Sequence, residues 1–138
     1  GDDPLAIPVD RSILQGWKPD TSITHAAPED IDFVLRAAVQ PVTLWAEMGS
    51  YEGGSAILAA KRAEALAQEV GFERSTTTVV AVDTFLGDVR TFFRRTDGEK
   101  RALLKRDGTI NLYDRFRTNV EDSGMGYSIV PLLTTSVN

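Results

Sequence analysis

The strongest constraint on the fold is an alternation of apolar and turn-forming segments in the middle of the chain. Residues 42–48 form a short apolar run that ends at Gly49, and residues 76–82 form a run rich in β-branched side chains that ends at Asp83. Between these runs, the alanines of residues 56–70 recur at helical spacing. A strand, a helix and a second strand in this order predict a βαβ unit with parallel strands.

The same reasoning divides the chain into two parts. Residues 1–41 read as an irregular segment followed by a helix, and residues 42–138 as a partial Rossmann-like domain. Further helices are expected at about 97–107 and at 112–120, and a third strand at 128–133. The expected fold class is α/β, with a parallel sheet of about three strands in the order 3-2-1 and flanking helices. This is one half of a doubly wound fold.

Composition excludes several classes of function. The 138 residues contain no cysteine, which rules out thiolate zinc sites and a cysteine nucleophile. His25 is the single histidine, which rules out sites built on two histidines. The net charge of −5 argues against a general affinity for nucleic acid. The longest apolar runs are far shorter than the roughly 20 residues that span a bilayer, and no secretion signal is visible at the start. We therefore expect a cytoplasmic protein without nucleic-acid or membrane partners.

The glycine-rich turn at residues 49–55 lies between a predicted strand and a predicted helix, which is a cofactor-binding layout. Two cofactor classes fit it poorly. A phosphate-binding P-loop needs a lysine where Ser55 stands, and a dinucleotide fingerprint needs a glycine where Tyr51 stands.

The third class is S-adenosylmethionine. An acidic residue, Glu47, precedes Gly49 and Gly53 with the pattern acidic-x-Gly-x-x-x-Gly, and a second carboxylate, Asp83, ends the next strand. A carboxylate at that point can accept hydrogen bonds from both ribose hydroxyls. The alternative is that the glycines only shape a tight turn, with Glu47 and Asp83 as ordinary polar residues.

Several blocks of the sequence resemble one family. They are W-A-E-M-G-S-Y-E-G-G-S-A (45–56), A-V-D-T-F-L-G-D (81–88), L-Y-D-R-F-R-T-N-V (112–120), I-V-P-L (129–132) and T-S-V-N (135–138). In this order and spacing they resemble the class I S-adenosylmethionine-dependent methyltransferases of the Rossmann-like type, in the cephalosporin-hydroxylase-like subgroup. The resemblance implies methyl transfer to an oxygen or nitrogen of a small-molecule acceptor.

The resemblance also implies which residues hold S-adenosylmethionine, or its product S-adenosylhomocysteine. They come from the end of the first strand and the turn after it, from the end of the second strand and the residues after it, and from the residues after the third strand. By position they are Glu47, Gly49, Ser50, Tyr51, Gly53 and Ser55 around the methionine end, Asp83 on the ribose, Thr84 and Phe85 beside the adenine, and Thr135 and Ser136 at the adenine rim.

The chain also departs from this family, whose members continue with further strands where this sequence ends at Asn138. Those later segments usually supply the acceptor pocket and any general base, so the sequence names no catalytic residue and no metal ligand. We expect a truncated portion whose first strand has an unpaired edge, and hence a homo-oligomer formed through that edge. The alternatives are a non-catalytic Rossmann-like fragment that self-associates and, with less support, a nucleotide-binding oxidoreductase domain.

The stretch 90–106 is rich in arginine and lysine, interleaved with carboxylates. Such a pattern is typical of a solvated helix and loop. The functional alternative is a lid that closes over an anionic acceptor.

Overall fold

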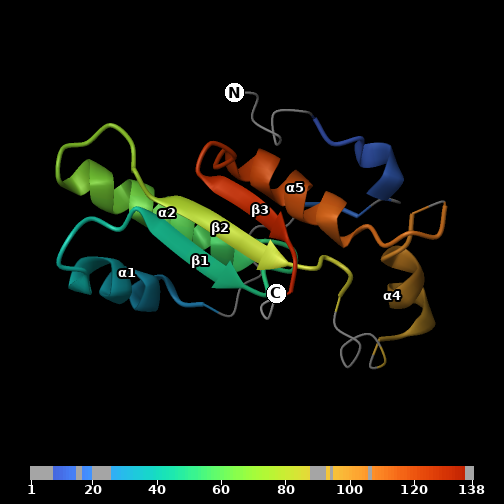
Figure 1. The fold of residues 1–138 in the computed structure, drawn as a ribbon. Helices are drawn as coiled ribbons and strands as arrows, with labels where there is room; N and C mark the ends of the chain where they lie inside the picture. The colour runs from blue at the N-terminus through green and yellow to red at the C-terminus, as the bar shows by residue number, and fades with distance from the viewer. Residues whose placement is uncertain are drawn as a thin grey trace.

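The computed structural model describes residues 8–14, 17–19, 26–87, 93, 95–105 and 107–135, and it confirms the α/β fold class (Figure 1). Strands and helices alternate along most of the chain. In order, the elements are the short 3-10 helix η1 (Arg11–Leu14), α1 (Pro28–Ala37), β1 (Leu44–Met48), α2 (Gly54–Glu69), β2 (Thr78–Asp83), α4 (Asp97–Ala102), α5 (Leu112–Ser123) and β3 (Ile129–Leu133).

The three strands form one parallel sheet in the order β1-β2-β3, so that β2 is central. This is the predicted order 3-2-1, read from the other edge. Ala46 pairs with Val80, which pairs with Val130 on the other side. Pro131 lies opposite Ala81 in β3, which is an edge strand of the described sheet, where the missing N–H of proline is tolerated.

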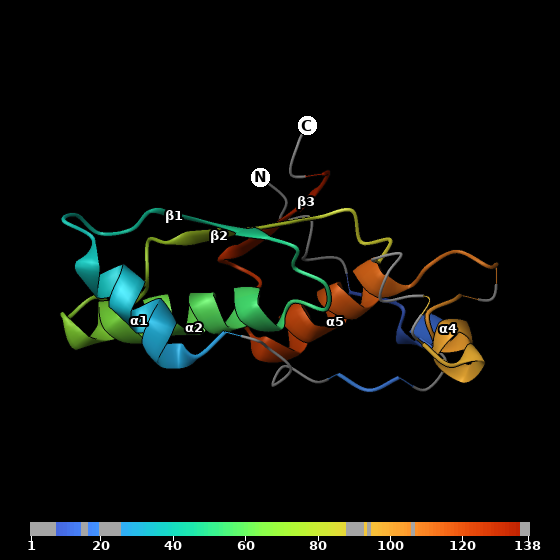
Figure 2. The same ribbon diagram turned by 90° about the horizontal axis from the view of Figure 1, so that it is seen from below.

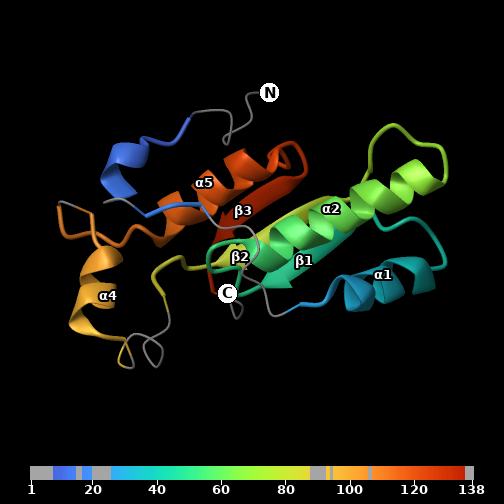
Figure 3. The same cartoon turned by 180° about the vertical axis from the view of Figure 1, so that it is seen from behind.

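The described helices lie on one side of the sheet (Figure 2). Seen from that side, α2 lies along the strands, with α1 and α5 on either side of it (Figure 3). Side chains from α2, α5 and the inward face of the strands make the core. Its largest buried members include Ile57, Val79, Phe116, Val120 and Ile129. In the part of the chain that the structure describes, no helix is long and apolar enough to cross a membrane.

The opposite face of the sheet is apolar, and its residues on β1 and β3 are exposed, whereas Val82 of the central strand is buried. Alternate residues of each strand point to it, because successive side chains of a strand point to opposite faces. Leu44 and Met48 of β1 are 61% and 59% exposed, and Val130 and Leu132 of β3 are 46% and 49% exposed. We call this surface, together with Ala46 and Val80 in the same register, the open sheet face.

Two local differences from the sequence-based expectations have physical causes. The segment before α1 was expected to be irregular, but it contains η1, whose Leu14 is buried. This helix packs against α5, where its Arg11 Nη2 lies 3.4 Å from Glu121 Oε2, and the backbone N of Val9, just before the helix, donates to Glu121 Oε1 at 2.9 Å. Local sequence carries no signal for such a contact.

The helix expected at about 97–107 ends earlier, at Ala102. Its start is fixed by a capping box between Thr96 and Glu99. After it, Leu104 forms an antiparallel bridge with Ile110, and the chain reverses through a turn in which Gly108 has a φ of +82°. A glycine favours this left-handed backbone, so the turn replaces the last turns of the expected helix.

Candidate functional site

The glycine-rich turn connects β1 to α2 at the carboxyl edge of the sheet, where parallel α/β sheets commonly bind ligands. The chain continues the sheet ladder first, because Gly49 N donates to the carbonyl of Val82 at 2.8 Å. It then turns through three residues of positive φ, which are Gly49 at +79°, Tyr51 at +48° and Gly53 at +90°. A positive φ at a tyrosine is uncommon and costs conformational energy.

The two outer glycines have different surroundings. A Cβ on Gly53 would come within 2.8 Å of Phe116 Cδ2, so this glycine is required by core packing. A Cβ on Gly49 would meet nothing within 4 Å. The backbone at Gly49 is therefore open to close approach by another molecule, whereas Gly53 is explained by architecture alone.

Asp83, at the end of β2, forms hydrogen bonds both with this turn and with the segment that follows β2. Its Oδ2 accepts a hydrogen bond from Tyr51 N at 2.8 Å, and its Oδ1 accepts one from Phe85 N at 2.9 Å. The carboxylate thus has a clear structural role. Each carboxylate oxygen can accept a further hydrogen bond, so the same group retains acceptor capacity for a ligand.

Thr84 and Phe85, the two residues after Asp83, differ in how deeply they are buried. Thr84 is half-buried, and its hydroxyl oxygen accepts a hydrogen bond from Leu86 N at 3.3 Å. Phe85 is buried, with its ring 5.2 Å from that of Tyr113 and 4.9 Å from that of Phe116, centroid to centroid. A contact from Phe85 to a ligand would therefore come from its backbone and not from its ring.

Glu47 is half-buried near the end of β1. Burial raises the pKa of its carboxyl, while hydrogen bonds from the side chains of Ser55 and Trp45 act in the opposite direction. Ser50 is buried, and its hydroxyl donates to the carbonyl of Glu47 at 3.4 Å. Glu47, Ser50 and Ser55 therefore belong to one hydrogen-bonded group around the turn.

The residues expected at the adenine rim are described only in part. Thr135 is exposed and lies two residues beyond the end of β3. Because the three strands are parallel, this position is at the same edge of the sheet as the glycine-rich turn. Ser136 lies outside the described residues.

Two interactions at the turn were not predicted from the sequence. The Arg95 guanidinium hydrogen-bonds to the Tyr51 hydroxyl and lies 5.8 Å from the centroid of its ring. Arg95 belongs to the basic stretch 90–106, whose composition alone does not distinguish one arginine from another. This contact brings a positive charge to the turn.

The second interaction is a buried ion pair. Glu52 Oε1 lies 3.0 Å from Arg115 Nη1, with both side chains about nine-tenths buried. Asn119 supports the same segment, because its Nδ2 donates to the carbonyl of Glu52 at 2.8 Å. Glu52 and Arg115 are 63 residues apart, so no short-range pattern could have indicated this pair.

Within the described ranges, no group of three or more acidic or histidine side chains is arranged to hold a metal ion. Compared with known protein families and with curated proteins, the chain matches no family model and no curated protein. The site offers a negative group at Glu47, a positive group at Arg95, acceptor capacity at Asp83 and an open backbone at Gly49.

Proposed function

We propose that this protein binds S-adenosylmethionine at the glycine-rich turn and serves methyl transfer to an oxygen or nitrogen of a small-molecule acceptor. The main support for the proposal is the position of Asp83 beside the glycine-rich turn. The Asp83 carboxylate links the backbone of the turn to the segment after β2, next to a glycine with open space beside it. The sequence resemblance to methyltransferases supports the same ligand.

The charges around the turn suit the amino-acid end of this ligand, which carries both an ammonium and a carboxylate group. Glu47 would accept hydrogen bonds from the ammonium group, and a nearby cation would relieve the cost of burying an ionised Glu47. Arg95 would donate to the carboxylate while remaining next to Tyr51. A ligand with opposite charges on one end is thus matched by residues of opposite charge.

The remaining residues would hold the nucleoside. Asp83 would accept from the ribose hydroxyls with the lone pairs that Tyr51 N and Phe85 N leave unused. Thr84, the backbone of Phe85 and Thr135 lie along the edge where the adenine would rest. The ligand itself would supply a methyl group on a positively charged sulfur. The contribution of this chain would be to hold that group in line with an acceptor, which is catalysis by proximity.

Isothermal titration calorimetry with two related ligands tests this proposal. S-adenosylhomocysteine has the amino-acid end, and 5′-methylthioadenosine lacks it. We expect micromolar binding of S-adenosylhomocysteine and, in Glu47→Gln, about a tenfold loss of its affinity, because a hydrogen bond to a charged group contributes roughly 1.5–3 kcal/mol. Affinity for 5′-methylthioadenosine should not change in this variant. Glu73→Gln is the matched control, since Glu73 is exposed between α2 and β2. If folded wild-type protein binds neither ligand, the proposal is wrong.

A second candidate function is favoured by the open sheet face. In the described sheet β1 has a hydrogen-bonded neighbour on one side only, and its outward residues are apolar. Antiparallel pairing of β1 with the β1 of a second copy, centred on Ala46, would set Leu44 opposite Met48 and join two open faces into one. The protein would then be a non-catalytic, self-associating module.

Sedimentation velocity across micromolar concentrations tests this second candidate. We expect a dimer for the wild type and a monomer for Ala46→Pro, because proline removes a backbone donor at the centre of the edge. Thr43 and Gly49, at either end of β1, bond to β2, so in the alternation of a parallel ladder Ala46 N–H faces the free edge. Met48→Lys serves as the second variant, in case Ala46→Pro fails to fold, and should weaken the dimer while leaving the ladder intact. A wild-type monomer at all concentrations would rule the candidate out. Cytoplasmic localisation stays a prediction.

A further inference from the structure

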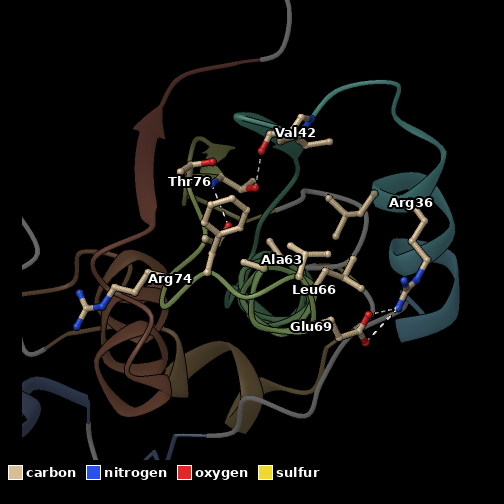
Figure 4. A pocket seen from close by; sticks show the side chains of 14 residues that line it. Arg36, Val42, Ala63, Leu66, Glu69, Arg74 and Thr76 are labelled. Carbon is tan, nitrogen blue, oxygen red and sulfur yellow. Dashed lines mark hydrogen bonds and ion pairs between the residues drawn. The ribbon is translucent and has the colours of Figure 1, made fainter.

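A cavity lies at the opposite edge of the sheet from the glycine-rich turn. It has a volume of about 480 Å³ and is bounded by the last turns of α1 and α2 and by the residues that lead into β1 and β2 (Figure 4). Cavities of roughly 300–1,000 Å³ are the size that binds small molecules. Nothing in the proposed function makes use of this cavity.

The wall of the cavity is mostly apolar. In Figure 4, Ala63 and Leu66 rise from α2, and Val42 lies across from them. The apolar side chains that line it are Leu35, Pro41, Val42, Ala63, Leu66, Ala67, Val70 and Phe72. Several of these are at least partly exposed to solvent, and Val70 and Phe72 are mostly exposed. An apolar ligand would therefore remove its own apolar surface and that of the cavity wall from water, which is favourable.

The charged side chains of the wall are engaged with one another or point elsewhere. Arg36 Nη2 pairs with Glu69 Oε2 at 2.8 Å, at one side of the cavity (Figure 4). The Arg74 side chain points away from the cavity, and its guanidinium carbon lies 4.8 Å from the ring centroid of Tyr127. No net charge is thus directed at an occupant by these three residues.

Two of the polar side chains that line the cavity also form hydrogen bonds within the chain. The Thr77 hydroxyl donates to the carbonyl of Val42 at 2.5 Å. The Ser75 hydroxyl oxygen accepts from Thr77 N at 2.9 Å, and Ser75 N donates to Glu64 Oε2 at 2.9 Å. An ionised ligand would lose its hydration here, and the hydroxyl groups of Ser75 and Thr76 carry no charge to compensate it, which makes its burial costly.

We infer that this cavity binds an uncharged, largely apolar small molecule of aromatic or aliphatic character. The inference stands on the cavity volume, the apolar wall, the ion pair of Arg36 with Glu69 and the orientation of Arg74 away from the cavity. It is independent of the proposed cofactor site, which lies at the other edge of the sheet. It can therefore hold or fail whether or not the protein binds S-adenosylmethionine.

The probe for the experiment is N-phenyl-1-naphthylamine, an uncharged dye whose fluorescence rises in an apolar site. Its anionic relative 1-anilinonaphthalene-8-sulfonate has the same ring system with a sulfonate added. We expect saturable, one-to-one binding of the uncharged dye, and at least tenfold weaker binding of the anionic dye. An absence of saturable binding of the uncharged dye overturns the inference. Equal or tighter binding of the anionic dye overturns the assignment of an uncharged ligand.

Filling variants decide whether the dye occupies this cavity or the open sheet face. Ala63→Leu and Ala67→Leu add apolar volume to the wall from two positions of α2, so that a failure of one to fold leaves the other. We expect at least a tenfold loss of dye affinity in each folded variant. Met48→Lys alters the open sheet face and should leave the affinity unchanged. If the filling variants keep the affinity, or Met48→Lys loses it, the dye binds elsewhere and the inference is wrong.

Discussion

At the scale of single residues, two glycines of the glycine-rich turn look equivalent in the sequence but are required for different reasons. Gly49 and Gly53 both have a left-handed backbone, but only Gly53 faces a close neighbour, Phe116. A left-handed backbone costs an L-residue roughly 1–2 kcal/mol, and overpacking costs roughly 1–3 kcal/mol more. We therefore predict that Gly53→Ala lowers the free energy of unfolding by about 2–5 kcal/mol and Gly49→Ala by about 1–2 kcal/mol. Urea denaturation measures both, and equal losses would contradict the packing argument.

Arg95 is the residue at the turn whose role depends most on the ligand. If its guanidinium binds the carboxylate of S-adenosylhomocysteine, Arg95→Ala should lower the affinity for that ligand about tenfold or more, as expected for a charged hydrogen bond. Affinity for 5′-methylthioadenosine, which has no carboxylate, should stay the same. Tyr51→Phe keeps the ring and removes the hydroxyl, so it should cause a smaller loss. Titration calorimetry measures each value, and a loss shared equally by both ligands would show that Arg95 supports the turn and not the carboxylate.

The half-buried Glu47 predicts a pH dependence of stability. Burial raises the pKa of its carboxyl, so the folded protein holds this proton more tightly than the unfolded chain does. Stability from this group is therefore lost as pH rises from about 4.3, the usual value for Glu, through the raised pKa. We predict that Glu47→Gln melts at a higher temperature than the wild type at pH 7 and that this difference disappears toward pH 4. A difference that is constant with pH would contradict the prediction.

At the scale of elements, the buried pair of Glu52 and Arg115 joins the turn to α5. Arg115 also donates to the carbonyl of Ala102 at 2.6 Å, which connects α5 to the end of α4. Its guanidinium carbon lies 5.2 Å from the ring centroid of Trp17. One arginine thus contacts three separate segments of the chain.

Removing one partner of a buried pair leaves an uncompensated charge, which costs about 3–5 kcal/mol. We predict that Glu52→Leu lowers the free energy of unfolding by this amount. Arg115→Leu should lower it by at least as much, because Arg115 has further contacts. In the double variant, the free energy of unfolding should fall by less than the sum of the two single decreases, since no unpaired charge is then buried. Denaturant unfolding of the four proteins in this cycle provides the measurement. Additive losses would mean that the pair is not coupled.

The elements differ in how far the sequence could predict them. β1, α2 and β2 were predicted because each has a local periodicity and ends at a turn-forming residue. The fold class followed from their alternation, and the strand order from the doubly wound fold that they resemble. The early end of α4 and the presence of η1 could not be predicted, because they depend on the pairing of Leu104 with Ile110 and on the contact of Val9 with Glu121.

The same distinction applies to the candidate site. Glu47, the glycines and Asp83 form a pattern along the sequence, so they could be singled out before the structure was known. The attachment of Asp83 to the backbone of the turn, and the contact of Arg95 with Tyr51, depend on residues that are more than 30 positions apart. Only the folded chain brings these groups together.

At the scale of the whole molecule, the sheet separates three surfaces, of which one is polar and two are apolar. The carboxyl edge has charged and polar groups around the glycine-rich turn, and the opposite edge has an apolar cavity. The open sheet face is apolar and spans all three strands. Because these surfaces share few residues, ligand binding, dye binding and self-association can each be altered without removing the others.

The most direct test of the central claim is to map S-adenosylhomocysteine onto the protein by ¹H–¹⁵N correlation spectra. The account predicts that the amide signals that shift on titration come from residues 47–55 and 83–87. Signals from residues 63–77, around the apolar cavity, should stay in place. Shifts concentrated outside the turn, or no shifts in a well-dispersed spectrum, would contradict the claim that the glycine-rich turn and Asp83 form a cofactor site.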